Sequence, residues 1–126
     1  MSKRVDAETA KYRVLQEELQ VLVTQQQKYT QQANENSMVK QELDLVHDET
    51  KVYKMVGPVL LKQDLEEAKT NVNKRIEFIN HELEKVQKKI EEKETEAIRV
   101  RKEIATIQME MQKQAAEASR NAIAAN

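Results

Sequence analysis

Histidine and carboxylate side chains are the groups of this chain that could transfer protons or bind a metal ion. The two histidines, His47 and His81, are far apart in the sequence. If the chain folds back about Gly57, His47 comes to lie near Glu67. His81 then lies near Ala33, so the two imidazoles do not meet. Each histidine is interpreted as a partly solvated helix residue, and no metal site is expected.

Other residues that support enzyme chemistry are missing or dispersed. The sequence has no cysteine, which excludes disulfides and thiolate metal ligands. A glycine-rich phosphate loop is also excluded, because Gly57 is the single glycine. The 22 Asp and Glu residues are interspersed with 21 Lys and Arg residues, so we expect them on solvated helix faces without a pocket that shifts a pKa. The sequence therefore predicts no catalytic residue, no cofactor and no enzyme activity.

The charge balance indicates which partners to expect. A net charge of −1 with both signs interspersed provides no basic stripe for nucleic acid. No apolar run approaches the length of a membrane span. The first ten residues are charged and lack the apolar region of a secretory signal. We therefore expect a soluble, intracellular protein that binds neither nucleic acid nor membranes and whose partners are other proteins.

The composition predicts long helices. Charged residues make up 34% of the chain, and Gly57 and Pro58 are its only glycine and proline. A chain with so few turn-forming residues has few turns, so its elements must be long. Ala, Glu, Lys, Gln, Leu and Arg dominate, which is typical of long or coiled helices. The predicted fold class is all-α dominated.

A heptad pattern runs through the second half of the chain. Its a positions are Ile76, Leu83, Ile90, Ala97, Ile104, Met111 and Ala118. Its d positions are Ile79, Val86, Lys93, Val100, Ile107 and Gln114. Strict alternation of spacings of three and four is the seam of a coiled coil. Asp64, with Glu67 three residues later, predicts the N-terminal cap, so we place this helix at 64–120 and expect a frayed tail at 121–126.

The first half has a similar but less regular pattern. Its seam is predicted to contain Val5, Glu8, Tyr12, Leu15, Leu19, Leu22, Gln26 and Tyr29. The spacing slips near residues 34–37, where Asn and Ser disfavour a helix interior, and it resumes with Val39, Leu43 and Val46. We place this helix at 4–48 with a discontinuity near 34–37.

Two short apolar runs separate the helices. Residues 51–56 and 59–63 flank Gly57-Pro58, and this pattern predicts a β-hairpin over 51–63. An irregular loop between the helices is the alternative. A hairpin near the middle of the chain lets the helices pair as a long antiparallel two-helix coiled coil, which makes residues 1–126 one unit.

The predicted hairpin is too apolar to stand alone. A lone two-stranded hairpin is marginally stable in water, and its edges are unpaired. We therefore expect it to pair with hairpins of other chains. The candidate assembly residues are Val52, Tyr53, Met55, Val56, Gly57, Pro58, Val59, Leu60 and Leu61.

The sequence around the hairpin resembles the β-class subunits of prefoldin. The resemblance lies in residues 52–68 and 71–79, with support from 34–36 and 39–43. It implies one hairpin per β-class subunit and a heterohexamer of two α-class and four β-class subunits, whose hairpins form a double β-barrel platform. It also implies that the coil tips hold unfolded clients such as actin and tubulin for the cytosolic chaperonin, and that prefoldin itself consumes no nucleotide.

Several apolar side chains lie off the predicted seams near the free ends of the helices. They are Val14, Val21, Val23, Ile98 and Met109. One interpretation is scattered surface hydrophobic residues, which are ordinary. The resemblance to prefoldin favours the other, a client-facing surface whose side chains adapt to varied partners.

Two questions stay open at the level of sequence. The polar seam residues Gln26 and Lys93 either fix the register of the coil or loosen it. The whole chain is either a subunit of an ATP-independent chaperone or a structural coiled-coil tether or adaptor. The central apolar hairpin favours the chaperone subunit, because a plain tether does not require one.

Overall fold

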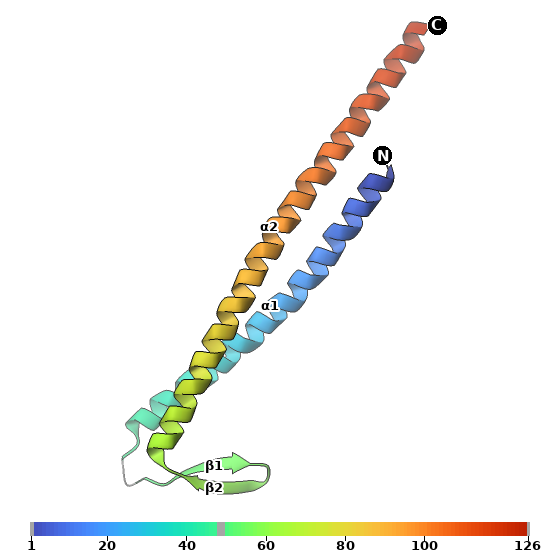
Figure 1. The fold of residues 1–126 in the computed structure, drawn as a ribbon. Coiled ribbons are helices and arrows are strands. Elements are labelled where there is room, and N and C mark those ends of the chain that lie inside the picture. The colour runs from blue at the N-terminus through green and yellow to red at the C-terminus, as the bar shows by residue number, and fades with distance from the viewer. Residues whose placement is uncertain (1, 48–49, 126) are drawn as a thin grey trace. The chain divides into compact units, whose positions relative to one another are not determined.

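The computed structural model describes residues 2–47 and 50–125, and within them it contains two helices and a two-stranded sheet (Figure 1). Helix α1 spans Ser2–Leu45 and helix α2 spans Leu65–Ala125. Strands β1 (Val52–Val56) and β2 (Val59–Gln63) lie between the helices in the chain. The predicted fold class, two long helices around one central β-hairpin, is confirmed.

Helix α2 begins where the sequence predicts. The Ala68 amide donates a hydrogen bond to the Asp64 carbonyl at 2.9 Å, so Asp64 is in the N-cap position. Glu66 and Glu67 lie in the first turn, where carboxylates interact favourably with the helix dipole.

The ends of the helices differ from the predicted bounds. Helix α1 ends at Leu45, and the predicted last residue, Asp48, lies outside the described residues. Helix α2 continues to Ala125, so the predicted frayed tail at 121–126 is helical in its described part; Asn126 lies outside the described residues. Alanine has the highest helix propensity, which explains why this Ala-rich segment remains helical although every residue from 112 to 125 is exposed.

The predicted discontinuity near residues 34–37 is wrong. Helix α1 passes through this segment without a break. The heptad spacing continues through the half-buried residues Tyr29, Asn36 and Leu43, whereas Val39 is exposed. The Asn36 side-chain amide donates to the Gln32 carbonyl at 2.7 Å, which satisfies a polar group at a seam position.

The hairpin has a two-residue turn at Gly57-Pro58. Its antiparallel register pairs Val52 with Gln63 at the open end and Val56 with Val59 beside the turn. Gly57 has φ +58°, a conformation that glycine adopts without strain, and glycine at the first turn position is typical of a type II′ turn. The predicted hairpin is confirmed, and the irregular loop is excluded.

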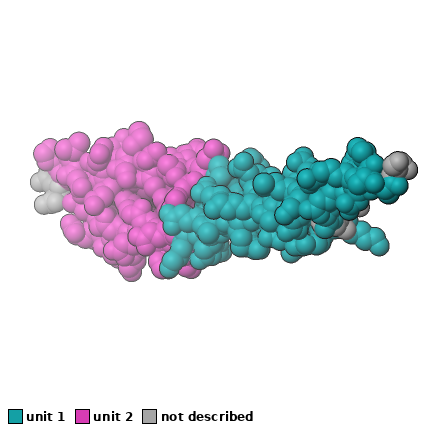
Figure 2. Space-filling model, turned by 90° about the horizontal axis from the view of Figure 1, so that it is seen from above, with its two compact units in different colours: residues 1–23, 88–126 teal, residues 24–87 magenta. Residues whose placement is uncertain are grey.

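The chain forms two compact units, which are coloured separately in Figure 2. Unit 1 comprises Met1–Val23 and Lys88–Asn126, and unit 2 comprises Thr24–Gln87. Unit 1 has a core of Leu15, Ala97 and Val100, against which Tyr12 and Ile104 pack. In unit 2 the buried residues are Leu65, Ala68, Val72, Ile79 and Val86.

The two helices run antiparallel within each unit. In unit 1, Lys93 Nζ lies 2.6 Å from Glu18 Oε2 and Arg4 Nη2 lies 3.1 Å from Glu103 Oε1. In unit 2, the Gln26 side-chain amide donates to Gln87 Oε1. The predicted seam of α2 agrees with the observed burial, since Ile79, Val86, Ile90, Ala97, Val100 and Ile107 are all buried.

Candidate functional site

The β-hairpin of unit 2 exposes nearly all of its apolar side chains. Val52 is half-buried, and the other eight candidate assembly residues are exposed. Among the large side chains of this set, Met55 is the most exposed at 74% and Val56 is the least exposed at 49%. Apolar surface at this density, in strands whose outer edges are unpaired within the described chain, is typical of an interaction site.

Apolar side chains occur on both faces of the hairpin. Residues that pair across an antiparallel ribbon share a face, and successive residues alternate between faces. One face therefore carries Val52, Lys54, Val56, Val59, Leu61 and Gln63, and the other carries Tyr53, Met55, Leu60 and Lys62. A free two-stranded ribbon cannot shield either face, so both are available to other strands or helices.

A second apolar surface lies on the coil of unit 1. Four of the five candidate client residues, Val14, Val21, Ile98 and Met109, are between 50% and 71% exposed. Val23 is half-buried and contributes less surface. All five residues belong to unit 1, so the structure places them on the same compact body.

An open groove of about 600 Å³ runs along this coil at Val14. Its apolar lining includes Ala7, Ala10 and the buried Leu15, and its charged rim consists of Lys11, Glu18, Lys93 and Glu96. The small alanine side chains keep the groove shallow, so it can accept an apolar side chain without enclosing a whole ligand.

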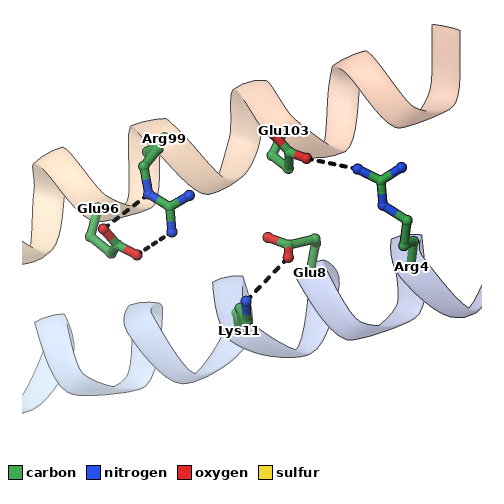
Figure 3. Close-up of polar contacts among 6 residues, drawn as sticks. All are labelled: Arg4, Glu8, Lys11, Glu96, Arg99 and Glu103. Atoms are coloured by element: carbon green, nitrogen blue, oxygen red, sulfur yellow. Dashed lines mark hydrogen bonds and ion pairs between the residues drawn. The ribbon is translucent and has the colours of Figure 1, made fainter. Parts of the chain in front are cut away.

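Figure 3 shows ion pairs on the two helices of unit 1. Arg99 binds Glu96 through two hydrogen bonds of 2.6 and 3.2 Å, and Lys11 Nζ lies 3.2 Å from Glu8 Oε1. The hydrogen bond from Arg99 is the main cause that lowers the pKa of Glu96, with further contributions from the charges of Arg99, Lys11 and Lys93. Glu96 and Glu8 are thus both salt-bridged to a neighbouring cation.

The polar seam residues have partners across the coil of their own unit. Lys93 pairs with Glu18 in unit 1, and Gln26 bonds Gln87 in unit 2. A partner at one specific position supports the interpretation that these residues fix the register.

Exposed hydrophobic residues outside the predicted sites also occur in unit 2. They are Met38, Val39, Leu45 and Phe78. Phe78 lies beside Gln32, Asn36, Lys74 and Arg75 in a shallow groove. Phe78 lies off the α2 heptad seam, and this position alone predicts an exposed side chain. The candidate residues chosen from the sequence nevertheless did not include it.

Groups that could hold a metal ion are dispersed. His47 and His81 are both exposed, and within residues 2–47 and 50–125 no three His, Cys, Asp or Glu side chains are clustered as metal ligands would be. Neither described helix contains a segment long and apolar enough to cross a membrane.

Long antiparallel helices that flank one exposed apolar hairpin define a class of helical protein. The comparisons identify the family. A family model described as "Prefoldin subunit" matches residues 6–113, and the chain belongs to the prefoldin family.

The sequence relatives and the solved structures agree with this assignment. The chain is 40% identical to the "Probable prefoldin subunit 6" of Drosophila melanogaster over 90% of this chain and 91% of that protein. It is 36% identical to the human "Prefoldin subunit 6" over 94% and 92% of the two chains. The crystal structure of the prefoldin β subunit from Thermococcus strain KS-1 superimposes with a TM-score of 0.79 at 22% identity, covering 82% of this chain and 91% of the other. The resemblance to β-class prefoldin subunits is confirmed, and both of these sequence relatives carry the name subunit 6.

Proposed function

We propose that this chain is a β-class subunit of a heterohexameric prefoldin with two α-class and four β-class subunits. In this proposal the complex acts in the cytoplasm without catalysis or nucleotide. It captures unfolded clients such as actin and tubulin and delivers them to the cytosolic chaperonin. Family membership supports the chaperone role, and the exposed apolar hairpin is the observation that carries the assignment of an assembling subunit.

The hairpin is the proposed assembly site. Its six large exposed apolar residues cannot be covered by a two-stranded ribbon. Pairing of its edges with strands of other subunits satisfies the free backbone groups and removes these side chains from water. Burial of a Val or Leu side chain contributes about 1.5–3 kcal/mol, so several such residues together can offset the entropy lost on association.

The coil surface of unit 1 is the proposed client site. An unfolded chain exposes apolar side chains without a fixed shape, so its binder needs dispersed and adaptable contacts rather than an enclosed pocket. Val14, Val21, Ile98 and Met109 are dispersed in this way, and the flexible side chain of Met109 can repack around different partners.

The ion pairs around this surface suit the same role. Glu96 is neutralised by Arg99 and Lys93 by Glu18, so the rim of the groove at Val14 carries little uncompensated charge. Such a rim does not select strongly for the charge of a client segment. Each contact is weak, and several coils of one hexamer that bind the same client gain affinity through effective concentration.

The test is a variant with four substitutions, Val14→Ser, Val21→Ser, Ile98→Gln and Met109→Gln, placed in an otherwise normal hexamer. We expect assembly to be unchanged, because neither the seam nor the hairpin is altered. Cross-linking of this subunit to a denatured client and suppression of client aggregation should both fall. The fall in aggregation suppression should be partial, because the other subunits contribute their own coils.

A matched control changes exposed apolar residues of unit 2, with Met38→Gln and Val39→Ser. This control should leave client cross-linking unchanged. Undiminished cross-linking in the four-residue variant, or cross-links confined to the hairpin, would contradict the proposed client site.

A further inference from the structure

The charges of the hairpin all have the same sign. From Thr50 to Gln63 the sequence contains three lysines, Lys51, Lys54 and Lys62, and no Asp or Glu. The chain as a whole is slightly acidic, with a net charge of −1. The hairpin is thus a local concentration of positive charge within its apolar surface.

The register places the two strand lysines on opposite faces of the ribbon. Lys54 pairs with Leu61, and Lys62 pairs with Tyr53 on the other face. Neither lysine has an ion-pair partner among the described residues. The two ammonium groups therefore avoid each other within the hairpin, and each face of the ribbon presents one of them.

This arrangement disfavours pairing between the β1 strands of two copies of the hairpin. Lys54 is the central residue of the five-residue strand β1. When two β1 strands overlap fully in a two-fold antiparallel pair, each Lys54 lies directly opposite its copy. Like charges directly opposite each other in a sheet are destabilising. The free edge of β1 thus carries a repulsive element against homo-oligomers built through that edge.

We propose that the hairpin selects neighbouring subunits whose own hairpins carry carboxylates opposite Lys54 and Lys62. The occupant is a strand of a different prefoldin subunit, apolar enough to cover Val56 and Leu60 and acidic at the positions that face the lysines. A buried or half-buried lysine in an assembled sheet needs a carboxylate partner, because its desolvation is otherwise costly. This proposal rests on the proposed role of the hairpin in assembly.

The test is charge reversal with Lys54→Glu and Lys62→Glu in hexamers reconstituted from this chain and its partner subunits. Incorporation of the variant, measured by native mass spectrometry against competing wild-type chain, should fall on the order of tenfold. Higher NaCl concentration should reduce this difference only in part, because salt screens half-buried charge pairs less than exposed ones. The matched control Lys28→Glu with Lys40→Glu makes the same charge change at exposed positions on α1 and should incorporate like wild type.

A second arm tests the same charges without the partner subunits. The Lys54→Glu, Lys62→Glu chain mixed with wild-type chain should form hetero-associated species that neither chain forms alone, because the mixture pairs carboxylates with lysines. Normal incorporation of the charge-reversed chain would overturn the proposal. A chain with Lys54→Gln and Lys62→Gln gives a second way to overturn it. If this chain incorporates normally but self-associates more strongly than wild type, the lysines only protect the strand edges and do not select a partner.

A third variant separates this proposal from the role of the hairpin itself. Val56→Asp with Leu60→Asp should block incorporation whatever the charge of the partner. If this variant assembles normally, the hairpin is not the assembly site and the proposed function fails. If it is blocked while charge reversal has no effect, only the carboxylate proposal is overturned.

Discussion

The hairpin of unit 2 and the seam of α2 contain the same kinds of side chain in opposite surroundings. Val56 in β1 is 49% exposed, whereas Val100 in the seam is 0% exposed. Both lie in regular secondary structure. The difference is that Val100 finds its partners, Leu15 and Ala97, within its own unit, whereas Val56 pairs across the ribbon with another exposed valine.

The seam of α2 and the hairpin serve different properties of the protein, stability and association. The seam supplies the apolar burial that holds the antiparallel helices together, because buried side chains in contact across the helices lose their water. The hairpin contributes little burial within the chain and keeps its apolar surface available to other chains. Substitutions in the two regions should therefore alter different measurements.

The largest expected effect is the loss of assembly when the hairpin is made polar. Val56→Asp with Leu60→Asp should abolish entry into the hexamer, because the carboxylates would be desolvated without partners in an assembled sheet. The helicity of the isolated chain, measured by circular dichroism, should stay close to wild type, because these residues contribute no burial to the coil. Met38→Asp with Val39→Asp is the control at exposed helix positions and should still assemble. If the Val56→Asp, Leu60→Asp variant assembles normally and keeps its helicity, the hairpin does not serve association and the two regions do not differ in this way.

The second effect is a loss of stability when the seam is truncated. Ile107→Ala should lower the free energy of unfolding by about 2–5 kcal/mol, because Ile107 is fully buried and its removal leaves a cavity. Met109→Ala, two residues along the same helix at an exposed position, is the matched control and should change stability by less than about 0.5 kcal/mol. Urea unfolding followed by circular dichroism measures both. Equal losses for the two variants would show that the seam does not hold unit 1 together.

The smallest effect is the pH dependence of the salt bridge on unit 1. The pKa of Glu96 is lowered below 4.5, chiefly by the hydrogen bond from Arg99. Its stabilising contribution is therefore present above pH 4.5 and is lost as the pH falls through the folded-state pKa. Glu96→Gln should be slightly less stable than wild type at pH 7, and the difference should shrink as the pH falls through the folded-state pKa of Glu96. A difference that persists or grows at low pH would contradict this assignment of the charge.

Much of the fold could be predicted from the sequence because it depends on local patterns. The heptad positions from Ile76 to Ile107 predict the α2 seam, and Gly57-Pro58 predicts the hairpin turn. The discontinuity at 34–37 was predicted wrongly. Asn36 has a low helix propensity, but in the structure its side-chain amide donates a hydrogen bond to the Gln32 carbonyl and the helix continues. The predicted end of α2, at residue 120, is too early. The prediction stopped there because the alanines that follow are not part of the heptad seam, but the high helix propensity of alanine continues the helix to Ala125.

The candidate surfaces were predicted less completely. The off-seam positions of Val14 and Met109 predict their exposure, and both are exposed. Val23, at another off-seam position, is half-buried, because the width of the contact between the helices exceeds a strict two-position seam. The roles of these residues in client binding and of the hairpin in assembly remain predictions that the experiments above address.

The sequence by itself determined which elements form and which face of α2 is apolar, because helix propensity, heptad spacing and the glycine of the turn act over a few neighbouring residues. Only the tertiary structure decided which apolar residues are covered and which polar groups meet. The pairing of Lys93 with Glu18 and of Gln26 with Gln87 depends on the register between the two helices. That register follows from the packing of segments distant in the chain, which no local pattern specifies.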